Sequence, residues 1–239
     1  ANVSYKEIAK HTIQDIGYTS ILDGFDPHQA DIICCFQKQS SDISKGVFNA
    51  SKQQGASDQG IMYGYASNET KECMPLSFVL ATKLVTALKK YREEKIFSFL
   101  KPDGKSQVTV EYNDHGDPYR IDAVVLSAQH AIDVAPEEVA EYLKALIKKT
   151  LPEELLDKKT KYYINTAGRF VVGGPSADTG LTGRKIMVDT YGTIAHQGGG
   201  SFSGKDCSKL DRSGAYMARY VAKNVVAAGL AKRCEVQLA

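Results

Sequence analysis

Several features that would assign a protein to a membrane or to nucleic acid are missing from this sequence. None of its apolar runs approaches the ~20 residues that a bilayer-spanning helix needs. The first residues lack the hydrophobic core of a signal peptide. Charge is balanced, with 30 Lys and Arg against 28 Asp and Glu and a net charge of +2. We therefore expect no membrane and no nucleic acid among its partners.

Cysteine is present, but not in a pattern that indicates disulfides or zinc. The five cysteines are an odd number and include no CxxC pair, which excludes a complete disulfide framework and leaves zinc or thioredoxin-like chemistry without support. Reduced cysteines favour a cytoplasmic location. Cys34 and Cys35 lie in the apolar run at 31–36, which predicts a short buried strand with both thiols in the core.

The periodicity of apolar residues predicts an α+β fold with helices layered on mixed sheets. A regular strand–helix alternation is lacking, which counts against a Rossmann fold. A hairpin is expected because NDHGDP separates two alternating runs. The predicted helices are 3–16, 76–95, a helix beginning at Pro136, and 211–228; the predicted strands are 31–36, 107–112, 120–129, 162–164, 185–190 and 234–238.

Residues 37–60 differ from the rest because they hold only three large apolar side chains, Ile43, Val47 and Phe48. A stretch of that length without a regular element is uncommon in a compact domain unless it serves as a lid or binding loop. A disordered surface loop is the alternative, and the sequence leaves both open.

The strongest chemical signal is the glycine-rich run Gly198-Gly-Gly-Ser-Phe-Ser-Gly-Lys-Asp206. Glycines allow the backbone to turn several N–H groups toward an anion, and a lysine and a helix follow. The run matches a P-loop through Lys205, but Asp206 stands where that motif needs a hydroxyl for Mg²⁺. An oligophosphate-binding loop is therefore expected, and a flexible glycine turn is the alternative.

Two further clusters could accompany this loop. Arg169-Phe-Val-Val-Gly-Gly-Pro175 and Arg184-Lys185 place bases near Asp178, although Arg184 and Lys185 could be a solvated pair. The interval 168–212 mixes six bases with four acids, which suits phosphate and Mg²⁺. The cluster at 101–105 contains Asp103 and Lys105 but is also an ordinary turn. His130 and His196 could carry protons; without a carboxylate at a readable spacing, a structural or ligand-contacting role is favoured for each.

Together these segments resemble S-adenosylmethionine synthetases. The similarity follows family order along essentially the whole chain. The matching runs are Gly168-Arg-Phe-Val-Val-Gly-Gly-Pro175, Asp178-Thr-Gly-Leu-Thr-Gly-Arg-Lys185, Val188-Asp-Thr-Tyr-Gly192, Gly198 to Asp206, Lys209-Leu-Asp-Arg-Ser213, Asp58-Gln-Gly-Ile-Met-Tyr-Gly-Tyr-Ala66, Asn68-Glu-Thr70 and Lys101-Pro-Asp-Gly-Lys-Ser-Gln-Val108.

The resemblance implies a transferase reaction in S-adenosylmethionine biosynthesis. The sulfur of L-methionine attacks C5′ of ATP and expels triphosphate, which is then hydrolysed to pyrophosphate and phosphate. It implies two Mg²⁺ ions per site and K⁺ as cofactors. The implied fold has three similar α+β domains, each a mixed sheet with helices on one face, built from non-consecutive segments. The implied assembly is a homodimer or homotetramer with shared active sites.

The resemblance also assigns roles to residues. It implies that Lys105, Arg184, Lys185 and Lys205 act in catalysis and that Asp211 binds metal. The implied ATP-binding residues are Asp58, Asp103, Lys105, Arg169, Phe170, Asp178, Arg184, Lys185, Ser201 and Lys205, and the implied methionine-binding residues are Gln39, Asp178 and Lys209.

The sequence departs from the family pattern at Ser41, Ser57 and Gln197, and it lacks the family's His-Pro-Asp-Lys start and roughly its last quarter. We therefore expect a fragment, with an incomplete active site. The expected divisions are 1–41, the rest of an N-terminal domain; 42–60, a gating loop and linker; 61–173, a central domain; and 174–239, the first part of a C-terminal domain. Two alternatives remain: a non-catalytic nucleotide-binding subunit, and a P-loop-like phosphotransferase, against which Asp206 argues.

Overall fold

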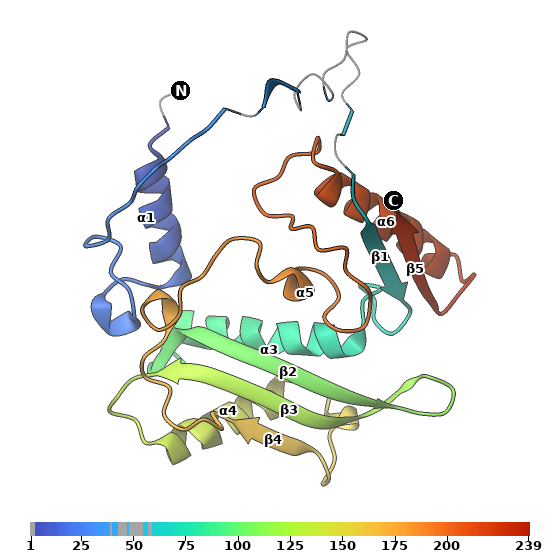
Figure 1. Cartoon of the computed structure of the whole chain (residues 1–239). Coiled ribbons are helices and arrows are strands. Elements are labelled where there is room, and N and C mark those ends of the chain that lie inside the picture. Colours follow the sequence, from blue (N-terminus) through green and yellow to red (C-terminus); the bar gives the residue numbers. More distant parts are fainter. Residues whose placement is uncertain (1–2, 39, 43–46, 48–54, 57–58) are drawn as a thin grey trace. The chain divides into compact units, whose positions relative to one another are not determined.

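The computed structural model describes residues 3–38, 40–42, 47, 55–56 and 59–239, and it divides the chain into two compact units. Unit 1 comprises residues 1–35 and 79–180, and unit 2 comprises residues 36–78 and 181–239. Each unit is therefore built from two segments that are distant in the sequence. The elements of both units are labelled in Figure 1.

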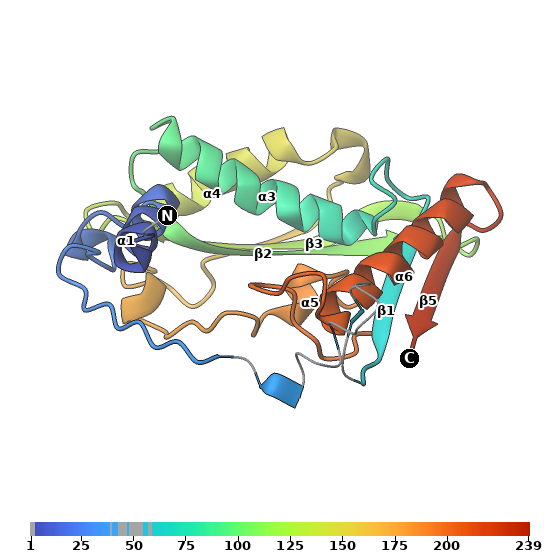
Figure 2. The ribbon, with the colours of Figure 1, turned by 90° about the horizontal axis from the view of Figure 1, so that it is seen from above.

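Unit 1 is built on a three-stranded sheet in the order β2–β3–β4. Strands β2 (Leu100–Tyr112) and β3 (Pro118–His130) form the predicted antiparallel hairpin, and β4 (Lys161–Ile164) pairs with β3 in parallel. Helices α3 (Leu76–Glu93) and α4 (Pro136–Thr150) cover one face of this sheet (Figure 2). The core lies between them, where Leu84, Val124 and Leu143 are fully buried.

Local sequence signals explain where these helices begin and end. Helix α1 (Tyr5–Ile16) begins after Ser4, whose hydroxyl accepts the Glu7 N–H, and ends at Gly17 in the left-handed conformation. Helix α4 has Pro136 in its first turn, acids following it and lysines in its last turn, as the helix dipole favours. Three short 3₁₀ turns lie at Ile21–Asp23, Glu153–Leu155 and Gly174–Ser176.

Unit 2 packs helix α6 (Leu210–Ala227) against the antiparallel pair β1 (Met62–Ser67) and β5 (Arg233–Leu238). Gly64 of β1 permits this packing, because a Cβ there would collide with the backbone of α6 at Ala218 and Arg219. The Arg219 guanidinium then donates hydrogen bonds to the backbone carbonyls of Tyr65, Glu72 and Cys73 at 2.7–2.9 Å. The helix is thereby held to β1 and to the turn that follows this strand.

Two predicted strands are wrong. The run at 31–36 has no regular structure, Ile33 is 84% exposed, and Cys34 and Cys35 are exposed rather than in the core. An apolar run becomes a strand only where another strand satisfies its backbone, and the described part of the chain places no strand beside it. Residues 186–189 form the short helix α5 (Ile186–Asp189), because the turn at Gly183 and the Thr190 hydroxyl, bonded to the Ile186 carbonyl at 2.8 Å, close a helical turn there.

The remaining predicted elements are confirmed, apart from shifts of their ends, and the fold is α+β as expected. Strand β1 had no counterpart in the prediction, because its six residues show no alternation of apolar and polar side chains. Most of the stretch 37–60, with its predicted gate, lies outside the described residues. Across the described part of the chain, no helix has the length and apolar character required to cross a membrane.

Candidate functional site

The predicted site residues fall into both units. Unit 1 carries Asp103, Lys105, Arg169, Phe170 and Asp178. Unit 2 carries Arg184, Lys185, Ser201, Lys205, Lys209 and Asp211. Gln39 and Asp58 lie outside the described residues. Each group is described below within its own unit.

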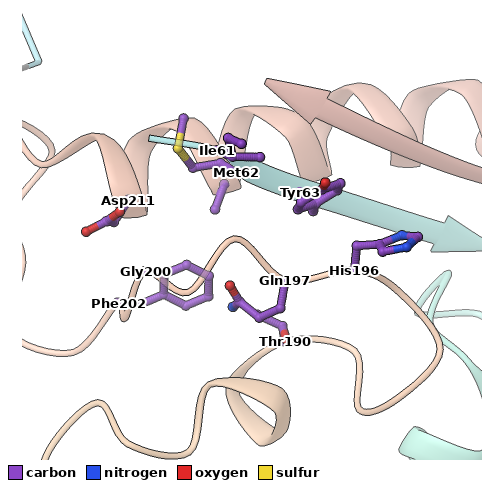
Figure 3. A pocket seen from close by; sticks show the side chains of 10 residues that line it. Ile61, Met62, Tyr63, Thr190, His196, Gln197, Gly200, Phe202 and Asp211 are labelled. Atoms are coloured by element: carbon purple, nitrogen blue, oxygen red, sulfur yellow. The ribbon is translucent and has the colours of Figure 1, made fainter. Parts of the chain in front are cut away.

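In unit 2 the glycine-rich loop lies against β1 and the start of α6, and its contacts fall on alternate residues. Gly198 meets the carbonyl of Ile61, which leaves no room for a side chain. Gly200 meets the carboxylate of Asp211 in the same way. Figure 3 shows Gly200 and Phe202 on the loop and Asp211 on the helix. The two glycines thus bring the loop backbone up to the body of the unit.

Lys205 and Asp211 form the central charge pair of this loop. Their Nζ and Oδ2 atoms are 2.5 Å apart, with the two side chains 28% and 38% exposed. Asp211 lies in the first turn of α6, where the helix dipole favours a carboxylate. Arg212 donates a hydrogen bond to the Lys205 carbonyl, so the end of the loop is tied to the helix as well. A lysine and a carboxylate are therefore held side by side at the end of a glycine loop.

A second contact brings the predicted phosphate-binding bases to the loop. A Cβ at Gly183 would lie 2.7 Å from the Ser201 hydroxyl, and Gly183 has a φ of +77°, which a side chain would strain. Arg184 and Lys185 follow at once and are exposed. The backbone of 183–185 therefore runs beside the glycine loop, as a shared anion site requires.

The turn between the loop and α6 explains why an aspartate, Asp206, stands where a P-loop has a hydroxyl residue. Asp206 Oδ1 accepts hydrogen bonds from the backbone and the hydroxyl of Ser208, at 2.8 and 2.5 Å. These bonds hold the pKa of Asp206 below its usual value. Lys209 Nζ lies 3.1 Å from the same hydroxyl. Asp206 therefore shapes the turn that presents Lys205 and Lys209.

A small cavity lies between the loop, β1 and α6 (Figure 3). Its volume of about 10 Å³ is close to the minimum for one water molecule. Gln197, Phe202, Asp211 and Tyr63 are among its lining residues. An oligophosphate is far larger, so it would have to bind on the open side of the loop.

Asp211, in the first turn of α6 beside the loop, is the carboxylate that could hold a metal ion. Mg²⁺ in nucleotide sites takes one or two carboxylates, with phosphate oxygens and water as its other ligands. Within the described ranges, no three His, Cys, Asp or Glu side chains are grouped to hold an ion by themselves. The donor set therefore fits Mg²⁺ shared with a phosphate and does not fit a metal enclosed by protein ligands. No K⁺ ligand was predicted in this chain.

In unit 1 Asp103 belongs to a buried polar network. Its Oδ2 accepts the Gly174 N–H at 2.9 Å, and its own N–H donates to Gln129 Oε1 at 3.4 Å. Gln129 is fully buried and donates to the Val171 carbonyl at 3.0 Å. This network joins the predicted nucleotide-contacting segments near 103 and 171. Lys105 and Asp178 are exposed.

His130 has a structural role, one of the roles that the sequence left open for it. It is fully buried, its Nε2 accepts the Phe170 N–H at 3.2 Å, and its Nδ1 lies 2.9 Å from the Ala131 carbonyl. Because Nε2 accepts, Nδ1 is the nitrogen that donates to this carbonyl. His130 therefore positions Phe170, and the neighbouring Arg169 donates to the Ile132 carbonyl at 2.5 Å.

His196 has the carboxylate partner that sequence spacing did not reveal. Its Nδ1 lies 2.7 Å from Glu235 Oε1, and its backbone N–H donates to Glu235 Oε2 at 2.9 Å. The two residues are 39 positions apart. The sequence signal for this partner was the alternation of β5. It puts the polar residues Arg233, Glu235 and Gln237 on one face of the strand.

Fold and site together define an α+β protein with a glycine-rich, lysine-bearing loop next to a helix-borne carboxylate. Two family profiles match the chain. The S-adenosylmethionine synthetase central domain matches residues 53–170, and the C-terminal domain of the same family matches residues 172–239. The chain belongs to the S-adenosylmethionine synthetase family, as the sequence motifs predicted.

A curated relative agrees with this assignment. The S-adenosylmethionine synthase of Desulfosudis oleivorans is 54% identical over 243 aligned positions, which include all of this chain. The chain spans 62% of the length of that relative.

Proposed function

We propose that the protein carrying this chain makes S-adenosylmethionine from ATP and L-methionine. The observation that carries the proposal is the glycine loop of a synthetase-family chain, with Lys205 and Asp211 paired at 2.5 Å beside it. Triphosphate leaves as a highly charged group, so the reaction needs fixed cations and dipoles around the leaving group rather than a protein nucleophile.

In this proposal the residues of unit 2 bind the triphosphate. Arg184, Lys185, Ser201 and Lys205 hold its oxygens, and the loop backbone adds N–H donors. Asp211 would hold Mg²⁺, which when bound neutralises part of the triphosphate charge. Lys209 and Gln39 contact methionine. Lys205 is paired with Asp211 here, so substrate binding would give each of them a new partner of opposite charge.

The residues of unit 1 are assigned to the nucleoside. Arg169 and Phe170 would hold the adenosine part, with the Phe170 ring against the base. Asp103 and Lys105 contact ATP, Asp58 lies near the nucleotide, and Asp178 touches both substrates. The buried His130 and Gln129 support this proposal, because they hold the backbone around Phe170 and Asp103.

K⁺, a second Mg²⁺ and a second copy of the chain complete the proposal. Two copies would share active sites as a dimer or tetramer. Light scattering on the full-length protein tests this, because a monomer that forms S-adenosylmethionine at full rate would contradict shared sites.

The function is tested with full-length protein, ATP, Mg²⁺, K⁺ and methionine. Mass spectrometry should detect S-adenosylmethionine, and pyrophosphate and phosphate should appear only when methionine is present. Lys205→Met should lower the rate by about 10²–10³-fold, because it leaves transition-state charge uncompensated. Lys223→Met, an exposed lysine on α6, is the control and should leave the rate unchanged.

The two other functions predict different results. Phosphate release without methionine would indicate a phosphotransferase. ATP binding without any product would indicate a non-catalytic nucleotide-binding subunit. An unchanged rate in Lys205→Met would remove the proposed role of that lysine.

A further inference from the structure

The outward face of β5 is polar, and each of its three side chains has a defined partner. Arg233 pairs with Glu69 at 3.2 Å, and Gln237 accepts a hydrogen bond from the Tyr63 hydroxyl at 3.0 Å. These two partners lie in β1 or directly after it. Glu235, between them, instead bonds His196, which lies outside the sheet. Glu235 is therefore the member of this row that reaches out of the sheet.

His196 is the residue from which the chain enters the glycine loop. The Glu235 carboxylate takes both its backbone N–H, at 2.9 Å, and its ring Nδ1, at 2.7 Å. The ring also lies against Tyr63 of β1, with centroids 5.4 Å apart (Figure 3). Because one bond goes to the main chain, Glu235 restrains the path of the backbone as well as a side chain.

Two of the contacts that follow in the loop are made by glycines, which have no side chain to anchor them. Gly198 lies against the Ile61 carbonyl and Gly200 against the Asp211 carboxylate, both by close approach of backbone. Glycine loses more conformational freedom than any other residue when it is ordered. A charge-assisted hydrogen bond at residue 196 therefore lowers the entropy that the loop must still lose when it closes on an anion.

We propose that Glu235 is a positioning residue for the glycine loop: its carboxylate, by holding the backbone of His196, pre-orders the backbone of 198–204 for an oligophosphate. Glu235 itself does not touch the ligand. The proposal rests on the proposed function, because that function supplies the oligophosphate. A purely structural role in the β1–β5 pair is the competing explanation.

The test measures the affinity of full-length protein for inorganic tripolyphosphate by calorimetry. Glu235→Ala should raise Kd about tenfold. Glu235→Gln keeps an oxygen for the backbone N–H and should recover most of the affinity. His196→Ala removes the ring but keeps the backbone bond, so its Kd should stay closer to the wild-type value than that of Glu235→Ala.

Gln237→Ala is the matched control, because it removes a hydrogen bond from the same face of the same strand without touching the loop. Its Kd should equal that of the wild type. Thermal midpoint and mass by light scattering are recorded for every variant. Glu235→Ala should match Gln237→Ala in midpoint and mass while differing in Kd. If Glu235→Ala does not fold, the Kd of Glu235→Gln is compared with the Kd values of the wild type and Gln237→Ala. The Kd of Glu235→Gln should then be two- to threefold higher than both.

Three results would overturn the proposal. An unchanged Kd in Glu235→Ala would show that Glu235 does not influence the affinity of the loop for tripolyphosphate. Equal weakening in Glu235→Ala and Gln237→Ala assigns the effect to the sheet, and equal weakening in His196→Ala and Glu235→Ala assigns it to the ring. Failure of the proposed function is recognised separately, because then the wild-type protein itself would not bind tripolyphosphate.

Discussion

Single residues of this chain take part in ion pairs of very different character. Lys205 and Asp211 are joined by one short contact, which the proposed ligand and its metal ion would replace. Arg120 on β3 instead makes a fixed network, with two bonds to Asp157 at 2.7 and 3.0 Å, one to Glu111 at 2.9 Å and one to Asp122 at 3.0 Å. The Lys205–Asp211 pair can therefore exchange its partners for a ligand, whereas the Arg120 network supports the sheet.

The Arg120 network should make stability depend on pH in the acid range. Hydrogen bonds from Arg120 hold the pKa values of Asp157 and Asp122 below their usual range. A carboxyl with a lowered folded pKa stabilises the protein above its unfolded pKa of about 3.9, and the effect is lost as pH falls below that value. The urea midpoint of the wild type should therefore fall between pH 5 and pH 2.

Arg120→Met should make that acid-side decrease smaller, because neither carboxylate would then prefer the ionised form as strongly; the part that comes from other carboxyls with lowered pKa values, such as Asp206, should remain. Lys158→Met, which removes an exposed positive charge beside Asp157, is the control and should keep the wild-type slope. Equal slopes in wild type and Arg120→Met, measured by urea unfolding at several pH values, would show that the network does not govern the acid response.

Among the elements, β1 and α6 pack so closely that there is no room for a side chain at Gly64. Gly64→Ala should lower the free energy of unfolding by about 1–3 kcal/mol, because the added methyl group would push the α6 backbone away from β1. Urea denaturation followed by circular dichroism measures the change. Gly180→Ala, where a Cβ meets nothing within 4 Å and φ is not positive, should change it by less than about 0.5 kcal/mol. Similar midpoints for both variants would contradict the packing argument.

The elements also show which local signals are reliable. Helix α3 was predicted from an apolar stripe, and α4 from Pro136 with acids at its start and lysines at its end. Helix α6 was also predicted, and all three are long elements. The run at 31–36 and the run at 185–190 are shorter, and short apolar runs do not distinguish strand, helix and coil. The wrong predictions at α5 and at the exposed Cys34 and Cys35 follow from that ambiguity.

At the scale of the whole molecule, the chain alternates between its two compact units. The boundaries of the units, at 35/36, 78/79 and 180/181, differ from the family-domain matches at 53–170 and 172–239. Strand β5 and helix α6 lie in the last segment, but their partner β1 lies more than a hundred residues earlier. Neither unit can therefore be obtained by cutting the chain once.

A fragment of residues 181–239 should consequently be unfolded. Without β1 the inward face of β5 and the buried face of α6 have no partner, so the fragment cannot bury enough apolar surface. A chain joining 36–78 to 181–239 through a Gly/Ser linker contains all of unit 2 and should fold. Circular dichroism and proton NMR distinguish the two. A cooperative thermal transition in 181–239 alone would contradict the expectation.

The sequence by itself determined the family, the α+β class, most of the helices and strands, and the glycine loop with Lys205. These follow from short-range patterns: motifs of eight or nine residues, apolar periodicity, and turn residues. Tertiary structure alone decided the pairing of β1 with β5, the contact of Gly183 with Ser201, the burial of His130 and the bond of Glu235 to His196. The physical reason is distance along the chain. An ion pair or strand pair between residues 39 or 174 positions apart depends on how the backbone folds back, and no local pattern encodes that.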